Sequence, residues 1–161
     1  ADLCAVGCPM VRVRLEGMET LALLDSGAQV NVVSLELARK LHMLISKNLD
    51  VSGIRYDGQH SAFYGVVRSA KVTMGDVSVT TSMFVTERHD PECPVILGRP
   101  YQKKGRMSIW NDDHGACHGM VYDEDLDHSV EFQAVSVENP SDMGFDQLAT
   151  SKRSLNYRAD R

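Results

Sequence analysis

The chain has 161 residues, 43% of them hydrophobic, and a formal net charge of −5. A chain of this length is most simply one globular domain, which can bury roughly two-thirds of its surface without help from disulfides or metal. The acidic balance argues against a nucleic-acid partner, because phosphate binding relies on clustered Lys and Arg. No apolar stretch approaches the ~20 residues that cross a bilayer, and the N-terminus lacks the regions of a signal peptide. We therefore expect a cytoplasmic protein without a membrane partner, and its start at Ala1 rather than Met fits a domain cut from a longer polypeptide.

The four cysteines are too few and too irregularly spaced for the disulfide framework of a secreted protein, so reduced thiols are favoured. They are Cys4, Cys8, Cys93 and Cys117. A metal site can be assembled on paper from Cys117, His118 and His114, but structural zinc sites have two close pairs of ligands. We therefore expect neither a metal nor a cofactor.

The first part of the chain has the pattern of short strands. Residues 11–15 (VRVRL) alternate apolar and charged side chains, which is the period of a half-buried strand. Gly17 permits a turn into a second strand at 20–24, and a third short apolar run covers 31–34. A strand-rich fold is expected from this spacing.

One short amphipathic helix is predicted in the segment SLELARKLHML, which begins at Ser34. Ser34 can cap this helix, Glu36 lies in its first turn, and Arg39 and Lys40 follow later, as the helix dipole favours. Three leucines are expected on its buried face: Leu37, Leu41 and Leu44.

The rest of the chain returns to strand signals that are separated by turns. Asp57-Gly58 lies between the runs VSGIR and SAFYGVV and predicts the tip of a hairpin. Gly75-Asp76 predicts a second hairpin, between strands at 71–74 and 77–85. Further strands are expected at 95–97, 106–110, 118–122 and 130–137, with one helical turn at 99–104. After Pro140 the apolar periodicity fades, so we expect a flexible tail.

Asp25 stands out because it follows the apolar run LALL and precedes Ser26, Gly27 and Ala28. A carboxylate at the end of a buried strand is costly unless it is hydrogen-bonded or its ionisation is perturbed. Gly27 tolerates backbone dihedrals that are closed to other residues, and the Ser26 hydroxyl can tie a tight loop down. Asp25 is therefore either a turn residue or a residue kept for its chemistry.

Three segments together resemble the retropepsin family, the aspartic proteases of retroviruses and long-terminal-repeat retrotransposons. They are LLDSGAQVNVVS, the hairpin around Asp57-Gly58, and VILGRPY, and they span roughly residues 11–111. DSGAQ together with LGRPY looks most like retrotransposon proteases or domesticated relatives, and is also similar to the protease-like domain of DNA-damage-inducible ubiquitin-receptor proteins. The resemblance implies a mainly β fold with one or two short helices: the closed β-barrel half of an acid protease, functioning as a twofold homodimer.

The resemblance also implies a role for each matching position. Asp25 would be the catalytic carboxylate, and Ser26, where the family more often has Thr, would bond across to the partner's loop. Gly27 and Ala28 would complete the active-site loop. The flap over the substrate would lie within residues 54–63, and its members include Ile54, Arg55, Tyr56, Asp57, Gly58, Gln59 and His60. The motif packed behind the active-site loop would be Ile96, Leu97 and Gly98.

Peptide hydrolysis by carboxyl groups needs two of them, because one accepts a proton from water while the other donates a proton to the carbonyl. Two carboxyls about 3 Å apart cannot both ionise, so they share a proton and titrate as a pair. The chain has one Asp-Ser-Gly and no second Asp-Ser-Gly or Asp-Thr-Gly. The second carboxyl must then come from another copy of Asp25, which predicts a homodimer acting on a polypeptide substrate.

The expected organisation of the chain has four parts. They are an N-terminal extension at 1–9, the protease domain at 10–112, an extra acidic β-hairpin at 113–138, and a polar, flexible tail at 139–161.

The acidic hairpin invites a calcium-binding interpretation, because Asp123, Asp125 and Asp127 mimic the first ligands of a calcium loop. His128 and Ala134 stand where that loop needs Gly and Glu. A solvated hairpin is therefore favoured.

A non-catalytic module is the competing interpretation: a retropepsin-shaped dimer retained for dimerisation or peptide binding. Two features keep this interpretation open. Ser26 stands in place of Thr, and about fifty residues follow the last recognisable motif. Viral members build much of their dimer interface from terminal strands, and the strands expected at 118–122 and 130–137 would replace or obstruct that sheet. Ser26 as a hydrolase nucleophile is disfavoured, because the strained G-x-S-x-G elbow is missing.

Overall fold

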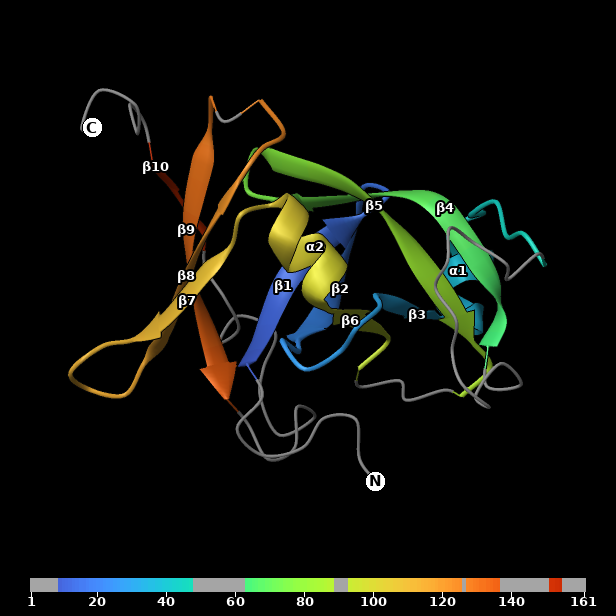
Figure 1. Cartoon of the computed structure of the whole chain (residues 1–161), viewed down its shortest axis with the longest axis horizontal. Coiled ribbons are helices and arrows are strands. Elements are labelled where there is room, and N and C mark those ends of the chain that lie inside the picture. The colour runs from blue at the N-terminus through green and yellow to red at the C-terminus, as the bar shows by residue number, and fades with distance from the viewer. Residues whose placement is uncertain (1–8, 48–62, 89–92, 126, 137–150, 155–161) are drawn as a thin grey trace.

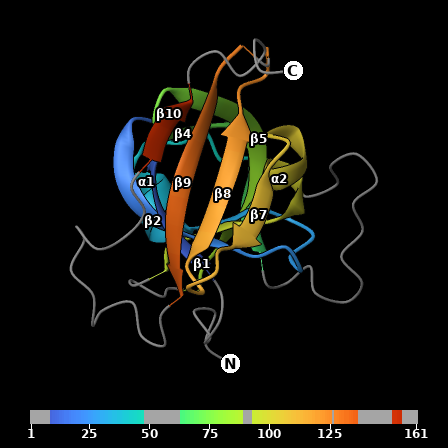
Figure 2. The ribbon, with the colours of Figure 1, turned by 90° about the vertical axis from the view of Figure 1, so that its left-hand side faces the viewer.

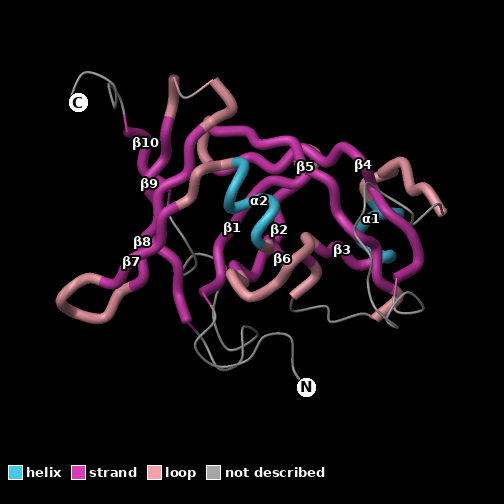
Figure 3. Tube along the Cα trace, viewed as in Figure 1, coloured by secondary structure: helices cyan, strands magenta, loops and turns pink. Residues whose placement is uncertain are grey.

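The computed structural model describes residues 9–47, 63–88, 93–125, 127–136 and 151–154 (Figure 1). This part of the chain is mainly β with two short helices, as the sequence predicts (Figure 3). The strands are β1 (Pro9–Leu15), β2 (Met18–Leu24), β3 (Val32–Ser34), β4 (Phe63–Met74), β5 (Val77–Thr86), β6 (Val95–Leu97), β7 (Ser108–Asn111), β8 (Cys117–Tyr122), β9 (Ser129–Ser136) and β10 (Ser151–Ser154). The helices are α1 (Leu35–Lys40) and α2 (Arg99–Lys104).

Six strands close on themselves as a barrel, in the order β1-β2-β6-β3-β5-β4 and back to β1. The β1–β2 and β4–β5 pairs are antiparallel hairpins, whereas β2 runs parallel to β6 and β3 runs parallel to β5. The parallel β2–β6 pair aligns Leu24 with Leu97, so the ends of these two strands lie side by side. The predicted closed β-barrel is therefore confirmed.

Side chains of the barrel strands fill its core. On β1 the alternation predicted from VRVRL is confirmed, because Val11, Val13 and Leu15 are buried while Arg14 is exposed. Helix α2 adds Tyr101, which is completely buried. Burial of this apolar face is what stabilises the β1 register, since a slip by one residue would turn the arginines inward.

A second group of strands extends the barrel on one side (Figure 2). Strands β7, β8 and β9 form antiparallel pairs, and β9 continues the sheet by pairing with β1 through Pro9 and Ser136. Gly119 and Phe132 are opposite each other in this sheet, and a Cβ on Gly119 would lie 2.2 Å from the Phe132 ring. The segment expected to be a tail contains β10, which pairs with the other part of β9.

Helix α1 is shorter than the sequence predicts. Its first turn is capped as expected, because the Ser34 hydroxyl accepts a hydrogen bond from the Leu37 N–H at 3.2 Å. The helix ends before Leu41, and His42 adopts a left-handed conformation with φ of 54°. Leu44 is consequently 89% exposed, so its predicted place on the buried face is wrong.

Other boundaries differ from the expected ones in smaller ways. The sequence predicts two separate runs at 61–67 and 71–74, but 63–74 is one continuous strand, β4, with a register irregularity between Val67 and Ala70. The hairpin at Gly75-Asp76 is confirmed. Strand β7 starts only at Ser108, because the chain turns at Arg106, where φ is 47°. The predicted hairpin tip at Asp57-Gly58 lies outside the described residues.

No helix in the described residues is long and apolar enough to span a membrane.

Candidate active site

Asp25 follows the last residue of β2 and begins a tight turn. Its backbone N–H donates to the Leu97 carbonyl at 3.1 Å, and its own carbonyl accepts a hydrogen bond from the Ala28 N–H at 3.1 Å. The Asp25 side chain is partly exposed, and its Oδ1 accepts a hydrogen bond from the Gly27 N–H at 3.0 Å. The carboxylate is therefore oriented by its own loop and open to solvent.

The residues after Asp25 form the exposed part of this loop. Ser26 and Gly27 are exposed, and Ala28 is partly buried. A Cβ on Gly27 would lie 3.3 Å from the Asp25 Oδ1, which is a tight contact. Within the described part of this one chain, the Ser26 hydroxyl has no hydrogen-bond partner, so its bond to a partner loop stays a prediction.

Gly98 brings the Ile96-Leu97-Gly98 motif directly against the Asp25 loop. A Cβ at position 98 would lie 2.3 Å from the Val30 carbonyl oxygen and 2.7 Å from the Ala28 carbonyl oxygen. These are backbone atoms, so the loop itself would have to move to make room. The next residue, Arg99, donates its N–H to the Ala28 carbonyl at 2.9 Å. The structure thus places the two motifs in contact.

Asn31 is a site residue whose sequence context, the run VNVVS, predicts only a strand position. Its side-chain oxygen accepts hydrogen bonds from the N–H groups of Gly98 at 2.9 Å and Tyr101 at 3.3 Å. Its side-chain nitrogen donates to the Thr81 hydroxyl at 3.0 Å and the Ser82 carbonyl at 2.9 Å. The signal was one buried amide inside the apolar run VNVV, since a buried polar group must find partners.

The described part of one chain contains one Asp-Ser-Gly loop, and that loop supplies one carboxylate, Asp25. The Asp25 side chain has no hydrogen bond or ion pair to a second acidic side chain among these residues. The flap residues predicted at 54–60 lie outside the described residues. The described segments before and after residues 48–62 are joined by an antiparallel bridge. In this bridge Ser46 and Val66 exchange N–H···O bonds of 2.8 Å.

Two histidine side chains of the C-terminal sheet region, His118 and His128, form hydrogen bonds with aspartates. The His118 Nε2 lies 2.6 Å from the Asp112 Oδ2, and this hydrogen bond is the main cause that lowers the pKa of Asp112 below its usual value. The His128 Nδ1 lies 3.1 Å from the Asp123 Oδ2. Burial raises the pKa of the Cys117 thiol. Among the described residues no cluster of His, Cys, Asp or Glu is arranged to hold a metal ion.

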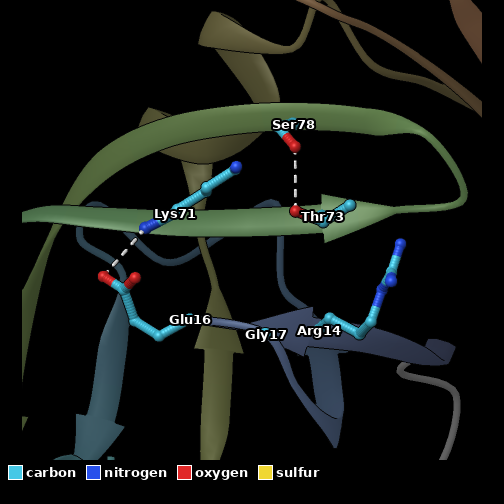
Figure 4. A pocket seen from close by; sticks show the side chains of 6 residues that line it. All are labelled: Arg14, Glu16, Gly17, Lys71, Thr73 and Ser78. Carbon is cyan, nitrogen blue, oxygen red and sulfur yellow. Dashed lines mark hydrogen bonds between the residues drawn. The ribbon is translucent and has the colours of Figure 1, made fainter. Parts of the chain in front are cut away.

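A polar surface hollow of about 410 Å³ lies elsewhere, between β1, β4 and β5 (Figure 4). Its lining residues are Arg14, Glu16, Gly17, Lys71, Thr73 and Ser78. The Glu16 carboxylate accepts a hydrogen bond from the Lys71 backbone N–H at 3.4 Å, and the Thr73 and Ser78 hydroxyls lie 2.8 Å apart (Figure 4). The hollow shares no residue with the Asp25 loop, so it is separate from the candidate active site.

Comparison with known families identifies this arrangement. A family model described as aspartyl protease matches residues 11–101, which include the Asp25 loop and the first half of α2. The chain belongs to the aspartyl protease family. No curated protein matches the sequence of this chain significantly.

Several solved structures resemble this aspartyl protease family member. The retroviral protease-like domain of Ddi1 from Leishmania major is 19% identical, with a TM-score of 0.53 over 70% of this chain and 87% of that chain. A retropepsin-like aspartic protease from Rickettsia conorii is 14% identical, with a TM-score of 0.44 over 66% and 76%. The EIAV protease is 18% identical, with a TM-score of 0.42 over 64% and 90%. The match to the Ddi1 domain shows a shared retropepsin-like fold.

Proposed function

We propose that this protein is an aspartic endopeptidase, in which two Asp25 carboxyls of a homodimer activate the water that hydrolyses a peptide bond. The observation that supports this most is the hydrogen-bonded placement of Asp25. Its backbone is fixed to Leu97, and its loop is fixed to α2 through Asn31 and Gly98. A catalytic group needs such a rigid support, because small displacements reduce catalysis strongly.

The geometry of one carboxylate suggests how the pair would work. The Gly27 N–H holds the Asp25 Oδ1 and leaves the Oδ2 without a partner in the described chain. When two such loops meet on a twofold axis, the two carboxyls share one proton, as in other aspartic proteases. The ionised Asp25 accepts a proton from water, while the protonated one donates to the substrate carbonyl. The water oxygen attacks the carbonyl carbon. When the C–N bond breaks, the leaving amine takes up the proton that the ionised Asp25 accepted from water, and the proton donated to the carbonyl returns to the other carboxyl.

The substrate in this proposal is an extended polypeptide, and the biological role is of the retrotransposon type. The enzyme would process the polyprotein from which it came, or it would be a domesticated relative that acts inside the cell. The sequence similarity of DSGAQ and LGRPY to those branches supports this assignment.

A non-catalytic dimerisation or peptide-binding module is the second candidate function. The observation that favours it is the pairing of β9 with β1 through Pro9 and Ser136, and through Met10 and Val135. Strand β9 thereby covers part of the edge of β1 in the same chain. A strand edge that is already paired is not available to a partner chain.

Cleavage of a diverse peptide library, measured against pH, separates the two functions. The native chain should cleave, pepstatin should inhibit it, and Asp25→Asn should lose activity by at least about a hundredfold. Asp113→Asn is the matched control, because Asp113 is an exposed turn residue outside the site, and it should cleave like the native chain. A folded native dimer that cleaves nothing at any pH would favour the non-catalytic module.

A further inference from the structure

A cluster of two cations and one phenol shares no residue with the Asp25 loop. The Arg39 Nη2 donates to the Tyr64 hydroxyl at 3.3 Å, and the Arg39 guanidinium carbon lies 5.5 Å from the centre of the Tyr64 ring. The Lys47 ammonium lies 3.1 Å from the same ring centre. Arg39 and Lys47 are exposed and Tyr64 is partly exposed, so a ligand from solvent can reach all three.

The three side chains come from separate segments that backbone hydrogen bonds hold together. The bridge between Ser46 and Val66 places Lys47 beside β4, which carries Tyr64. The chain that leaves α1 is tied back by the Met43 N–H, which donates to the Ala38 carbonyl at 3.0 Å. The cluster is therefore organised before any ligand binds, which reduces the entropy lost on binding.

Arg39 and Lys47 bring two positive charges to one aromatic ring. Two other cations of the chain lie near carboxylates: Arg12 lies 4.0 Å from Glu19, and Lys104 lies 3.5 Å from Glu124. In the part of the chain that the structure describes, neither Arg39 nor Lys47 forms an ion pair with a carboxylate. Two like charges against one ring repel each other, and a bound anion would remove that repulsion.

The two cations also affect the ionisation of the Tyr64 hydroxyl. The hydrogen bond from Arg39, followed by that from Lys47, lowers the pKa of Tyr64 below its usual value. A negative charge is thus favoured at this point of the surface.

We propose that Arg39, Lys47 and Tyr64 form a binding site for an oxyanion, a carboxylate or a phosphate group. Arg39 uses one of its five N–H donors on Tyr64, and Lys47 has three donors. Guanidinium and ammonium donors make short, charge-assisted hydrogen bonds to these groups, and the guanidinium fork matches their geometry. This oxyanion site extends the account beyond peptide cleavage, and it can exist whether or not the protein is an enzyme.

A structural interpretation of the same contacts predicts a different response. If the two cations only pack on the aromatic ring, as cation–π pairs commonly do, then added anions should act on Tyr64 through ionic strength alone. An oxyanion site should instead respond to phosphate in a saturable way that sodium chloride does not reproduce.

The test is an NMR titration of the native chain labelled with ¹³C at the tyrosine ring, with the Tyr64 signal assigned from Tyr64→Phe. Sodium phosphate should shift the Tyr64 signal to saturation, and sodium chloride at equal ionic strength should not. A second arm adds an unstructured decapeptide with a central Glu, or its Gln counterpart. Preference for the Glu peptide assigns the site to polypeptide carboxylates, whereas a response to phosphate alone assigns it to small anions.

Two double variants of equal charge complete the experiment. Arg39→Met with Lys47→Met should weaken phosphate binding by at least about tenfold. Arg14→Met with Lys71→Met, which empties the hollow of Figure 4 of its cations, should leave binding at the Tyr64 signal unchanged. The single change Arg39→Lys should retain part of the affinity, because the charge remains.

Three results would overturn the oxyanion site: no saturable response of Tyr64 to phosphate, an equal response to chloride, or equal weakening by both double variants. None of these readouts requires turnover. The inactive Asp25→Asn chain should bind phosphate like the native chain, so failure of the protease proposal leaves this test intact.

Discussion

The side-chain oxygen of Asn31 accepts a hydrogen bond from the Gly98 N–H at 2.9 Å, across 67 positions of sequence. This bond joins the end of the Asp25 loop to the start of α2. Since Asn31 also accepts from the Tyr101 N–H and donates to Thr81 and Ser82, one buried amide connects three parts of the barrel. The position of Asp25 therefore depends on a residue that has no acid–base chemistry of its own.

Replacing Asn31 with Ala should destabilise the fold by about 2–4 kcal/mol, because several buried polar groups lose their partner together. Chemical denaturation measures this free energy of unfolding. Asn111→Ala is the control, since Asn111 is exposed on β7 and should change stability by less than about 0.5 kcal/mol. Equal stabilities of the two variants would show that Asn31 does not connect these elements.

Gly98→Ala should be more damaging than Gly27→Ala. A Cβ at position 98 meets the backbone oxygen of Val30 at 2.3 Å, whereas a Cβ at position 27 meets the Asp25 carboxylate at 3.3 Å. Backbone cannot rotate away as a side chain can, so we expect a loss of about 2–3 kcal/mol for Gly98→Ala and less than half of that for Gly27→Ala. Thermal unfolding of both variants checks the order, and a reversed order would contradict the close approach at Gly98.

Tyr101→Phe should leave stability unchanged or raise it by up to about 1–2 kcal/mol. Tyr101 is completely buried, and its hydroxyl has no hydrogen-bond partner in the described chain, so removing the oxygen relieves a desolvation cost and keeps the ring packing. The same burial raises the pKa of Tyr101. Tyr101→Leu, which removes the ring as well, is the comparison and should destabilise. A clear loss of stability in Tyr101→Phe would mean that the hydroxyl has a partner after all.

The Asp112–His118 pair should make the C-terminal sheet sensitive to acid. The hydrogen bond from His118 lowers the pKa of Asp112 in the folded chain, so this pair stabilises the fold above the usual pKa of an aspartate. That contribution is lost as the pH falls through the lowered pKa of Asp112. His118→Ala should return the pKa of Asp112 toward its usual value, as measured by ¹³C NMR of the carboxyl carbon.

His114→Ala is the matched control for this pair. His114 contacts Asp112 through its backbone N–H at 2.8 Å, and this bond survives removal of the ring. The pKa of Asp112 should therefore stay low in His114→Ala. If both histidine variants raised it equally, the side-chain hydrogen bond from His118 would not be the main cause.

Local features of the fold were predictable from sequence because they depend on neighbouring residues. The alternation in β1 follows from VRVRL, and α2 lies at 99–104 as predicted, between Gly98 and Gly105 and with a proline in its first turn. The helix at Leu35–Lys40 ended early because His42 turns the chain with a positive φ, which the leucine spacing does not reveal.

Long-range relationships were not predictable in this way. The pairing of Pro9 with Ser136 joins residues that are far apart in the sequence, and no local pattern encodes it. Gly98 is held beside the Asp25 loop by one amide, Asn31, whose side-chain partners lie 50 or more residues away. The motif at Asp25 indicated the family, while the support of its loop required the fold.

The most direct test of the account is to mix the native chain with an excess of Asp25→Asn chain and to follow peptide cleavage. If two chains share one site, inactive mixed dimers should form, and activity per native chain should fall progressively toward zero as the excess grows. An equal excess of unrelated protein should have no effect. Unchanged activity per native chain, with subunit exchange shown by sedimentation of labelled chains, would contradict the shared Asp25 site.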